Sequence, residues 1–218
     1  MRAATLLRSA AACMLALAGA CAFAQGSPFA VAPVTFKLDT ATEFGAVEVS
    51  NRGEEPMGVE ATLVRVRLVE GKETYEPADE FTFSPPTFRL QAGKSRLVRF
   101  RYSGPRGATE GVYRLFLRQL PEATGSQQIA MVFNIGVPIF VAPSTASPSL
   151  AIVKNGPAPR MENTGNVTVT VSQLEGCAAA TEKILVRLFP GQATDLKEAQ
   201  ACATSAKTER GNIAIAVR

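Results

Sequence analysis

The chain has 218 residues, of which 46% are hydrophobic, and a formal net charge of only +4 from 23 basic and 19 acidic residues. This balance argues against a nucleic-acid-binding protein, which would carry a concentrated basic face. The chain contains no histidine, which removes the Ser-His and Cys-His nucleophiles, most zinc sites and the commonest general base. An enzyme is therefore the least favoured class of function, and we expect no cofactor and no metal site.

Residues 1–24 have the pattern of a secretory signal peptide. Arg2 and Arg8 supply a basic start, residues 10–20 are apolar and uncharged, and Ala22-Phe23-Ala24 is a small-x-small cleavage site. The apolar run is too short to span a bilayer. We therefore expect an exported, soluble protein without membrane insertion, 194 residues long after removal of the signal, with 21 basic residues against 19 acids.

An alternative reading makes Cys21 the lipid-modified cysteine of a lipoprotein. Residues 17–21 resemble a lipobox only in part, because Ala18 stands where leucine is usual. Cleavage after Ala24 is favoured.

From Phe29 onward the sequence reads as short alternating stretches separated by turn residues. Pro33 interrupts the first stretch, and Pro85-Pro86 must leave any central strand, because proline has no backbone N–H to donate. This spacing, without a helical period, predicts an all-β sandwich. The expected strands of the first unit are residues 29–38 in two runs, 45–50, 58–68, 81–84, 88–90, 95–102 and 112–120.

The last strand expected in this unit runs from Gln127 to Pro143, and its large apolar residues occupy alternate positions. Such a row is usually the core face of an antiparallel strand. Here Ala130 and Val132 make the opposite face apolar as well, so the strand needs a second partner, either another sheet of the same chain or another protein. The row consists of Ile129, Met131, Phe133 and Ile135.

Residues 143–148 read as a linker to a second, smaller unit. Its expected strands are residues 150–153, 167–171, 184–189 and 213–217. Cys177 and Cys202 are the two cysteines that remain after signal removal, and in an exported protein they most simply form one disulfide. A metal or redox pair is the alternative, although their spacing matches no CxxC-like motif.

The order of several segments resembles that of periplasmic pilus-assembly chaperones, which have two immunoglobulin-like domains and deliver subunits to outer-membrane ushers. No one segment is specific, and the resemblance depends on their joint order and spacing behind a signal peptide. The segments are Phe29-x-Val-x-Pro33, Val47-Glu-Val-Ser-Asn51, Phe83-Ser-Pro-Pro86, Leu90-x-Ala-Gly93, Glu110-x-x-Tyr113-Arg114-Leu115, Pro138-Ile-Phe-Val-x-Pro143, Asn163-Thr-Gly-Asn166 and Leu188-Phe-Pro-Gly191.

The resemblance implies two immunoglobulin-like β-sandwich domains in an L-shaped arrangement, residues 25–142 and 143–218, in the periplasm. It also implies that Ile129, Met131, Phe133 and Ile135 are lent to a pilus subunit that lacks a strand, by β-strand addition. The implied partners are pilus subunits and an usher. Self-association of the free chain through the same row is left open.

The best-known family members bind the subunit's terminal carboxylate with an arginine and a lysine. By alignment these positions fall on Thr35 and Pro138, neither of which carries a charge, so the chain looks more like the divergent archaic or spore-coat-protein-U-type branch. We expect another cation to replace them. Arg114 and Arg118, on one face of the strand at 112–120, are the first candidates, and Arg99 is a weaker one. The alternative is that these arginines are ordinary solvated side chains.

A different class of function is an immunoglobulin-like adhesin or pilus module that persists in the final surface assembly. A pilus subunit would normally have an extended N-terminal donor segment. Here only residues 25–28 separate the cleavage site from the first expected strand, which favours the chaperone.

Overall fold

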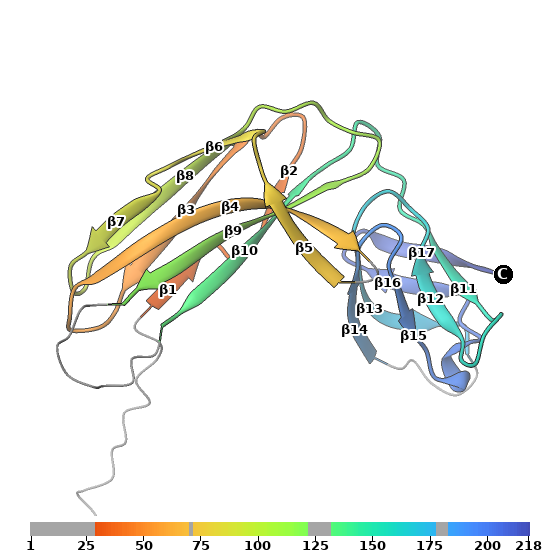
Figure 1. Ribbon diagram of the computed structural model, residues 1–218. Helices are drawn as coiled ribbons and strands as arrows, with labels where there is room; N and C mark the ends of the chain where they lie inside the picture. The colour runs from red at the N-terminus through yellow and green to blue at the C-terminus, as the bar shows by residue number, and fades with distance from the viewer. Residues whose placement is uncertain (1–28, 70–71, 122–131, 178–182) are drawn as a thin grey trace, which may run out of the picture.

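The computed structural model describes residues 29–69, 72–121, 132–177 and 183–218. Figure 1 shows two β-rich lobes that meet at an angle, so the molecule has the expected L shape. No α-helix occurs in these ranges, and the one short helical turn is the 3-10 helix η1 (Glu198–Gln200). The fold is all-β, with two immunoglobulin-like sandwiches, as predicted.

The first domain is a sandwich of two sheets, ordered β1-β3-β8-β6 and β2-β10-β9-β4-β5, with β7 paired to β4. Along β9, for example, Tyr113, Leu115 and Leu117 are buried and the residues between them are more exposed. This alternation turns one face of each sheet toward a shared core. The strands are β1 (Phe29–Ala32), β2 (Phe36–Leu38), β3 (Phe44–Asn51), β4 (Met57–Val69), β5 (Lys72–Pro77), β6 (Phe81–Ser84), β7 (Thr87–Leu90), β8 (Ser95–Tyr102), β9 (Gly111–Leu120) and β10 (Asn134–Val141).

Prolines mark the places where the chain passes from one sheet to the other. Pro33 separates β1, which pairs with β3, from β2, which pairs with β10. Pro85 and Pro86 separate β6, which pairs with β8, from β7, which pairs with β4. Because proline cannot donate to a ladder, each break confines a strand to one sheet.

The second domain has its own core and continues as one path of strands, β14-β13-β16-β17-β11-β12-β15. β17 pairs with β16 up to Ala214 and with β11 from Ile215 onward, so it joins the two halves of the sandwich. Cys177 and Cys202 form the predicted disulfide, with Sγ atoms 2.07 Å apart. The strands are β11 (Leu150–Val153), β12 (Arg160–Asn163), β13 (Val169–Glu175), β14 (Lys183–Leu188), β15 (Ala193–Asp195), β16 (Ser205–Thr208) and β17 (Gly211–Val217).

A buried carboxylate joins the two domains. Glu110, directly before β9, accepts a hydrogen bond from the Thr168 N–H at 2.8 Å and one from Arg210 Nη2 at 3.2 Å. Arg210 Nε also donates to the Thr168 carbonyl at 3.0 Å. Nearby, the rings of Phe140 and Phe189 lie 6.4 Å apart. Polar and apolar contacts thus both hold the domains at the elbow.

Nothing in the described part of the chain forms a helix of the length and apolarity that a bilayer crossing requires. The proposed signal peptide and Cys21 lie outside the described residues.

Candidate functional site

Strand β10 has a partner along its whole length on one side and along only part of its length on the other. Residues Asn134–Val141 pair with β9, whereas β2 pairs with Ile139–Val141 alone. Among the described strands, none forms a ladder with the second edge of residues 134–138. The backbone N–H and C=O groups that point to this edge can therefore receive another strand.

The described half of the predicted apolar row lies at the end of the first core. Phe133 and Ile135 are half-buried and pack against this core, on the same face as the fully buried Val137 and Ile139. The ring of Phe133 stacks on that of Phe29, with centroids 6.5 Å apart. Ile129 and Met131 lie outside the described residues.

The outer face of the same sheet carries Arg114, Phe116 and Arg118 at alternate positions of β9, as predicted from the sequence. The partners of Arg114 and Phe116 on β10 are Pro138 and Gly136. A Cβ added to Gly136 would lie 2.7 Å from Arg114 Cδ and 3.0 Å from Phe116 Cε1. The missing side chain at residue 136 thus lets the stem of Arg114 lie across β10.

Both of these arginines have carboxylate partners. Arg114 donates from Nη1 and Nη2 to the two carboxylate oxygens of Glu73, at 2.6 and 2.9 Å, and from Nη1 to the Tyr75 hydroxyl at 3.1 Å. Arg118 donates to one oxygen of Glu60, its neighbour on β4, from Nη2 at 2.6 Å and Nε at 3.1 Å. The Arg114 side chain is 20% exposed and the Arg118 side chain 52%.

The contact with Glu73 changes the electrostatics of both groups. Burial acts to raise the pKa of the Glu73 carboxyl, but hydrogen bonds from Arg114 and Tyr75 and the charge of Arg114 lower it below its ordinary value. Burial acts to lower the pKa of Arg114, but the Glu73 hydrogen bonds and charge raise it overall. The pair is therefore fully ionised at neutral pH.

Thr35 and Pro138, which align with the carboxylate-binding arginine and lysine named above, lie level with Arg114 in the sheet. The exposed Thr35 directly precedes β2, and the parallel pairing of Phe36 with Ile139 puts Thr35 level with Pro138. Pro138 in turn pairs with Arg114. Phe140, two residues further along β10 on the same face, contacts the second domain through Phe189. Thr35, Pro138 and Arg114 thus form a row across three strands beside the domain junction.

Arg99 lies elsewhere in the molecule. It belongs to β8 in the other sheet of the sandwich, where its partners are Ala46 and Ser84, and it is exposed. The structure therefore brings Arg114 and Arg118 to the sheet that contains β10 but does not bring Arg99 there.

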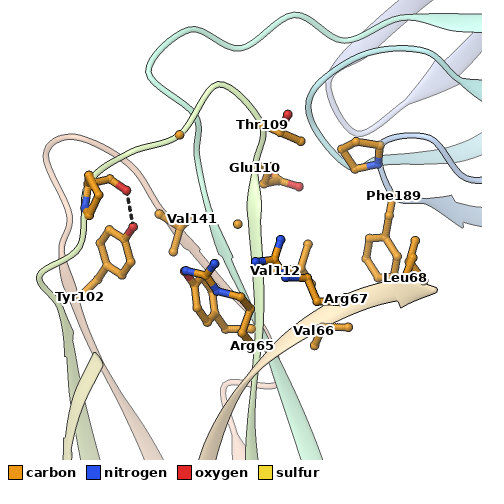
Figure 2. A pocket seen from close by; sticks show the side chains of 15 residues that line it. Arg65, Val66, Arg67, Leu68, Tyr102, Thr109, Glu110, Val112, Val141 and Phe189 are labelled. Atoms are coloured by element: carbon orange, nitrogen blue, oxygen red, sulfur yellow. Dashed lines mark hydrogen bonds between the residues drawn. The ribbon is translucent and has the colours of Figure 1, made fainter. Parts of the chain in front are cut away.

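A cleft of about 510 Å³ opens at the elbow between the two domains. Figure 2 shows Arg65, Val112 and Val141 on the side of the first domain and Phe189 on the side of the second. Arg65 is paired with Glu80 and donates to the Tyr113 hydroxyl at 3.1 Å. Burial raises the pKa of Tyr113 to about 12, partly offset by Arg65, so this hydroxyl is neutral. The described residues contain no cluster of three or more metal-ligating side chains.

Sequence reasoning missed the residues that approach Arg114 from β5. The strands expected from the sequence do not include Lys72–Pro77, although Thr74 and Tyr75 both favour strands. It also missed Glu110 and Arg210 as a pair, and no local pattern in the sequence signals a contact between residues so far apart.

Residues 28–147 match the pilus and flagellar-assembly chaperone family, PapD N-terminal domain. The chain is 31% identical over 118 residues to the probable fimbrial chaperone EcpE of Escherichia coli K12, covering 51% of this chain and 45% of that protein. EcpE of E. coli O127:H6 is 32% identical over 98 residues, covering 42% and 39%. The chain thus matches less than half the length of these relatives.

Solved structures share the fold at low identity. The CsuC–CsuE chaperone–tip subunit pre-assembly complex from the archaic Csu pili of Acinetobacter baumannii aligns with a TM-score of 0.63 at 16% identity, over 87% of this chain and 99% of that one. The class 5 fimbriae chaperone CfaA aligns with a TM-score of 0.64 at 17% identity, over 85% and 96%. The matched family consists of assembly chaperones and not of enzymes. From the match over residues 28–147, the chain belongs to the pilus and flagellar-assembly chaperone family that its sequence motifs resemble.

Proposed function

We propose that the chain is a periplasmic chaperone that captures pilus subunits by strand addition along β10 and delivers them to an outer-membrane usher. The observation that carries the proposal is the edge of β10 at residues 134–138, which pairs with none of the described strands and directly follows the apolar row that begins at Ile129 in the sequence. In this proposal residues 25–142 form the subunit-binding domain and residues 143–218 the second domain.

In strand addition, the free backbone edge of β10 and its alternating apolar side chains would have different roles. The free backbone groups would bond a strand of the subunit, and the alternate side chains would fill its open core. An apolar side chain of this size contributes about 1.5–3 kcal/mol when it passes from water into an apolar pocket. Phe133 and Ile135 are already half-buried, so each of them would gain less than a fully exposed side chain.

We propose Arg114 as the anchor for the subunit's C-terminal carboxylate. It lies level with Thr35 and Pro138, the positions where the resemblance places the missing charges, and beside the domain junction. Its guanidinium can bind a carboxylate through two parallel N–H groups, which a lysine cannot do. Arg118 is farther from the junction and more exposed, and Arg99 belongs to the other sheet.

Co-expression with small secreted proteins encoded beside this chain would test the proposal. A chaperone should appear in the periplasmic extract as a soluble one-to-one complex with a smaller protein. An adhesin or structural module would instead appear in the surface fraction, and this result would contradict the proposal. The structural neighbour CsuC was solved in a pre-assembly complex with the tip subunit CsuE.

A further inference from the structure

The contact between Glu73 and Arg114 is not a consequence of strand pairing. On β4, the residue opposite Glu73 is Leu68, whereas the residue opposite Arg114 is Val64. Four residues of a strand span about 13 Å, so the ladder alone would keep the two side chains apart. They meet nevertheless, so the hairpin of β4 and β5 bends toward the outer face of β9; in Figure 1 β5 crosses the point where β4 and β9 converge. The T-shaped contact of Tyr75 with Phe116, with centroids 5.3 Å apart, supports this position.

The pair differs from the other ion pair on this face. Arg118 binds Glu60, which the ladder places directly opposite, through one carboxylate oxygen. Arg114 binds both oxygens of a carboxylate that comes from outside its own and the neighbouring strands. This is the geometry in which arginine binds a free carboxylate most strongly.

Arg114 also retains an unused donor. Its Nε is buried and has no hydrogen-bond partner among the described residues. The adjoining Cδ lies over Gly136, on the strand proposed to receive the subunit. A carboxylate that replaces Glu73 on the side of β10 could therefore also accept a hydrogen bond from Nε once the side chain shifts.

We propose that Glu73 occupies the carboxylate-binding position of Arg114 in the free protein and gives it up to the C-terminal carboxylate of a bound polypeptide. The inference rests on the proposed function, in which Arg114 is the anchor. Exchange of one carboxylate for another keeps Arg114 paired in both states, which avoids the cost of an unpaired, partly buried charge. Glu73 thereby lowers the affinity for a ligand that presents a free carboxylate.

The test uses the mature chain and two fluorescein-labelled alternating valine–threonine peptides of about nine residues, the length of a long strand. One peptide ends in a free carboxylate and the other in an amide. Binding is followed by fluorescence anisotropy for the wild type, Glu73→Gln and Arg114→Ala, with Glu60→Gln as the matched control. Glu73→Gln should bind the carboxylate peptide about fivefold more tightly, a modest effect because the pair is partly exposed, and the amide peptide unchanged. Glu60→Gln should behave as the wild type.

A second readout follows the Glu73 carboxyl by carbon-13 NMR. Its lowered pKa should rise toward the ordinary value when the carboxylate peptide binds, because Arg114 has changed partner. A different result is that Glu73→Gln binds the carboxylate peptide as the wild type does while Arg114→Ala loses the preference for it. This result would show that Glu73 does not occupy the carboxylate-binding position and that Arg114 is still the anchor. If the wild type shows no preference for the carboxylate form, the anchor at Arg114 fails and this inference fails with it. If neither peptide binds, strand addition itself is contradicted.

Discussion

The carboxylate of Glu110 lies 3.2 Å from Nη2 of Arg210, although 100 residues separate them in the chain. The Glu110 side chain is only 2% exposed and that of Arg210 26%. A carboxylate so buried needs its partners, because an unpaired buried charge is costly. This contact belongs to the junction that sets the position of β10 relative to the second domain.

Replacement of Glu110 by Ala should therefore lower the free energy of unfolding by about 2–4 kcal/mol, since the Thr168 N–H and Arg210 both lose a partner. Urea denaturation measures the change, and small-angle scattering should show a wider range of domain angles. Asp195→Asn, which removes an exposed ion pair with Arg160, is the control and should cost less than about 0.5 kcal/mol. If the two substitutions lower the free energy of unfolding equally, the buried pair at the junction contributes no more to stability than an exposed pair does.

The donor row gives a second prediction. Met131→Asp should abolish subunit capture without lowering the melting temperature. Phe133→Asp should also abolish capture and, because Phe133 packs against Phe29, should lower the stability of the folded chain by about 1–2 kcal/mol. Capture is read by co-purification, with Val217→Asp on the second domain as an exposed apolar control. A failure of Met131→Asp to fold would mean that the row is an ordinary core face.

The anchor assignment predicts that Arg114→Ala loses subunit capture, whereas Arg118→Ala and Arg99→Ala retain most of it. Removal of one partner of a charge-assisted pair in a binding site typically weakens binding by about 2–5 kcal/mol. Affinity is measured by competition with a labelled subunit, and circular dichroism checks the fold. Wild-type capture by a folded Arg114→Ala variant would place the anchor elsewhere.

The stability advantage of the wild type over Glu73→Gln should depend on pH. The folded-state pKa of Glu73 lies below its ordinary value of 4.5, so the contribution is complete above that value and is lost as the pH falls through the folded pKa. We expect an advantage of about 0.5–1 kcal/mol at neutral pH for this partly exposed pair, which disappears in acid. Urea titrations from pH 7 to pH 3 test this, and a constant difference across the range would refute it.

Removal of the disulfide should weaken the second domain. The bond between Cys177 and Cys202 has a sequence separation of 25 residues, and a loop of this size is worth on the order of 3 kcal/mol in the chain-entropy model. The double Cys→Ser variant should unfold at a correspondingly lower urea concentration. Mass spectrometry of the non-reduced wild type should detect no free thiol, and two alkylatable cysteines would contradict the pairing.

Local patterns along the chain are enough to predict the class of fold, the strand breaks and the family. Alternation along β9 assigns Arg114 and Arg118 to one face, because side chains of a strand have a period of two whatever its neighbours are. Prolines 33, 85 and 86 mark changes of sheet for a similarly local reason, since a missing N–H breaks any ladder. The disulfide could be predicted without a structure, because only two cysteines remain after removal of the signal peptide.

Contacts between residues that are distant in the chain could not be predicted from these local patterns. Local periodicity says which way a side chain points, but not that β5 folds over β9 to bring Glu73 to Arg114, or that Glu110 reaches Arg210. It also does not show that Gly136 leaves room for the arginine stem, or that β2 stops short of residues 134–138. These contacts depend on the twist of the sheets and on the angle between the domains, which arise from the packing of many residues at once.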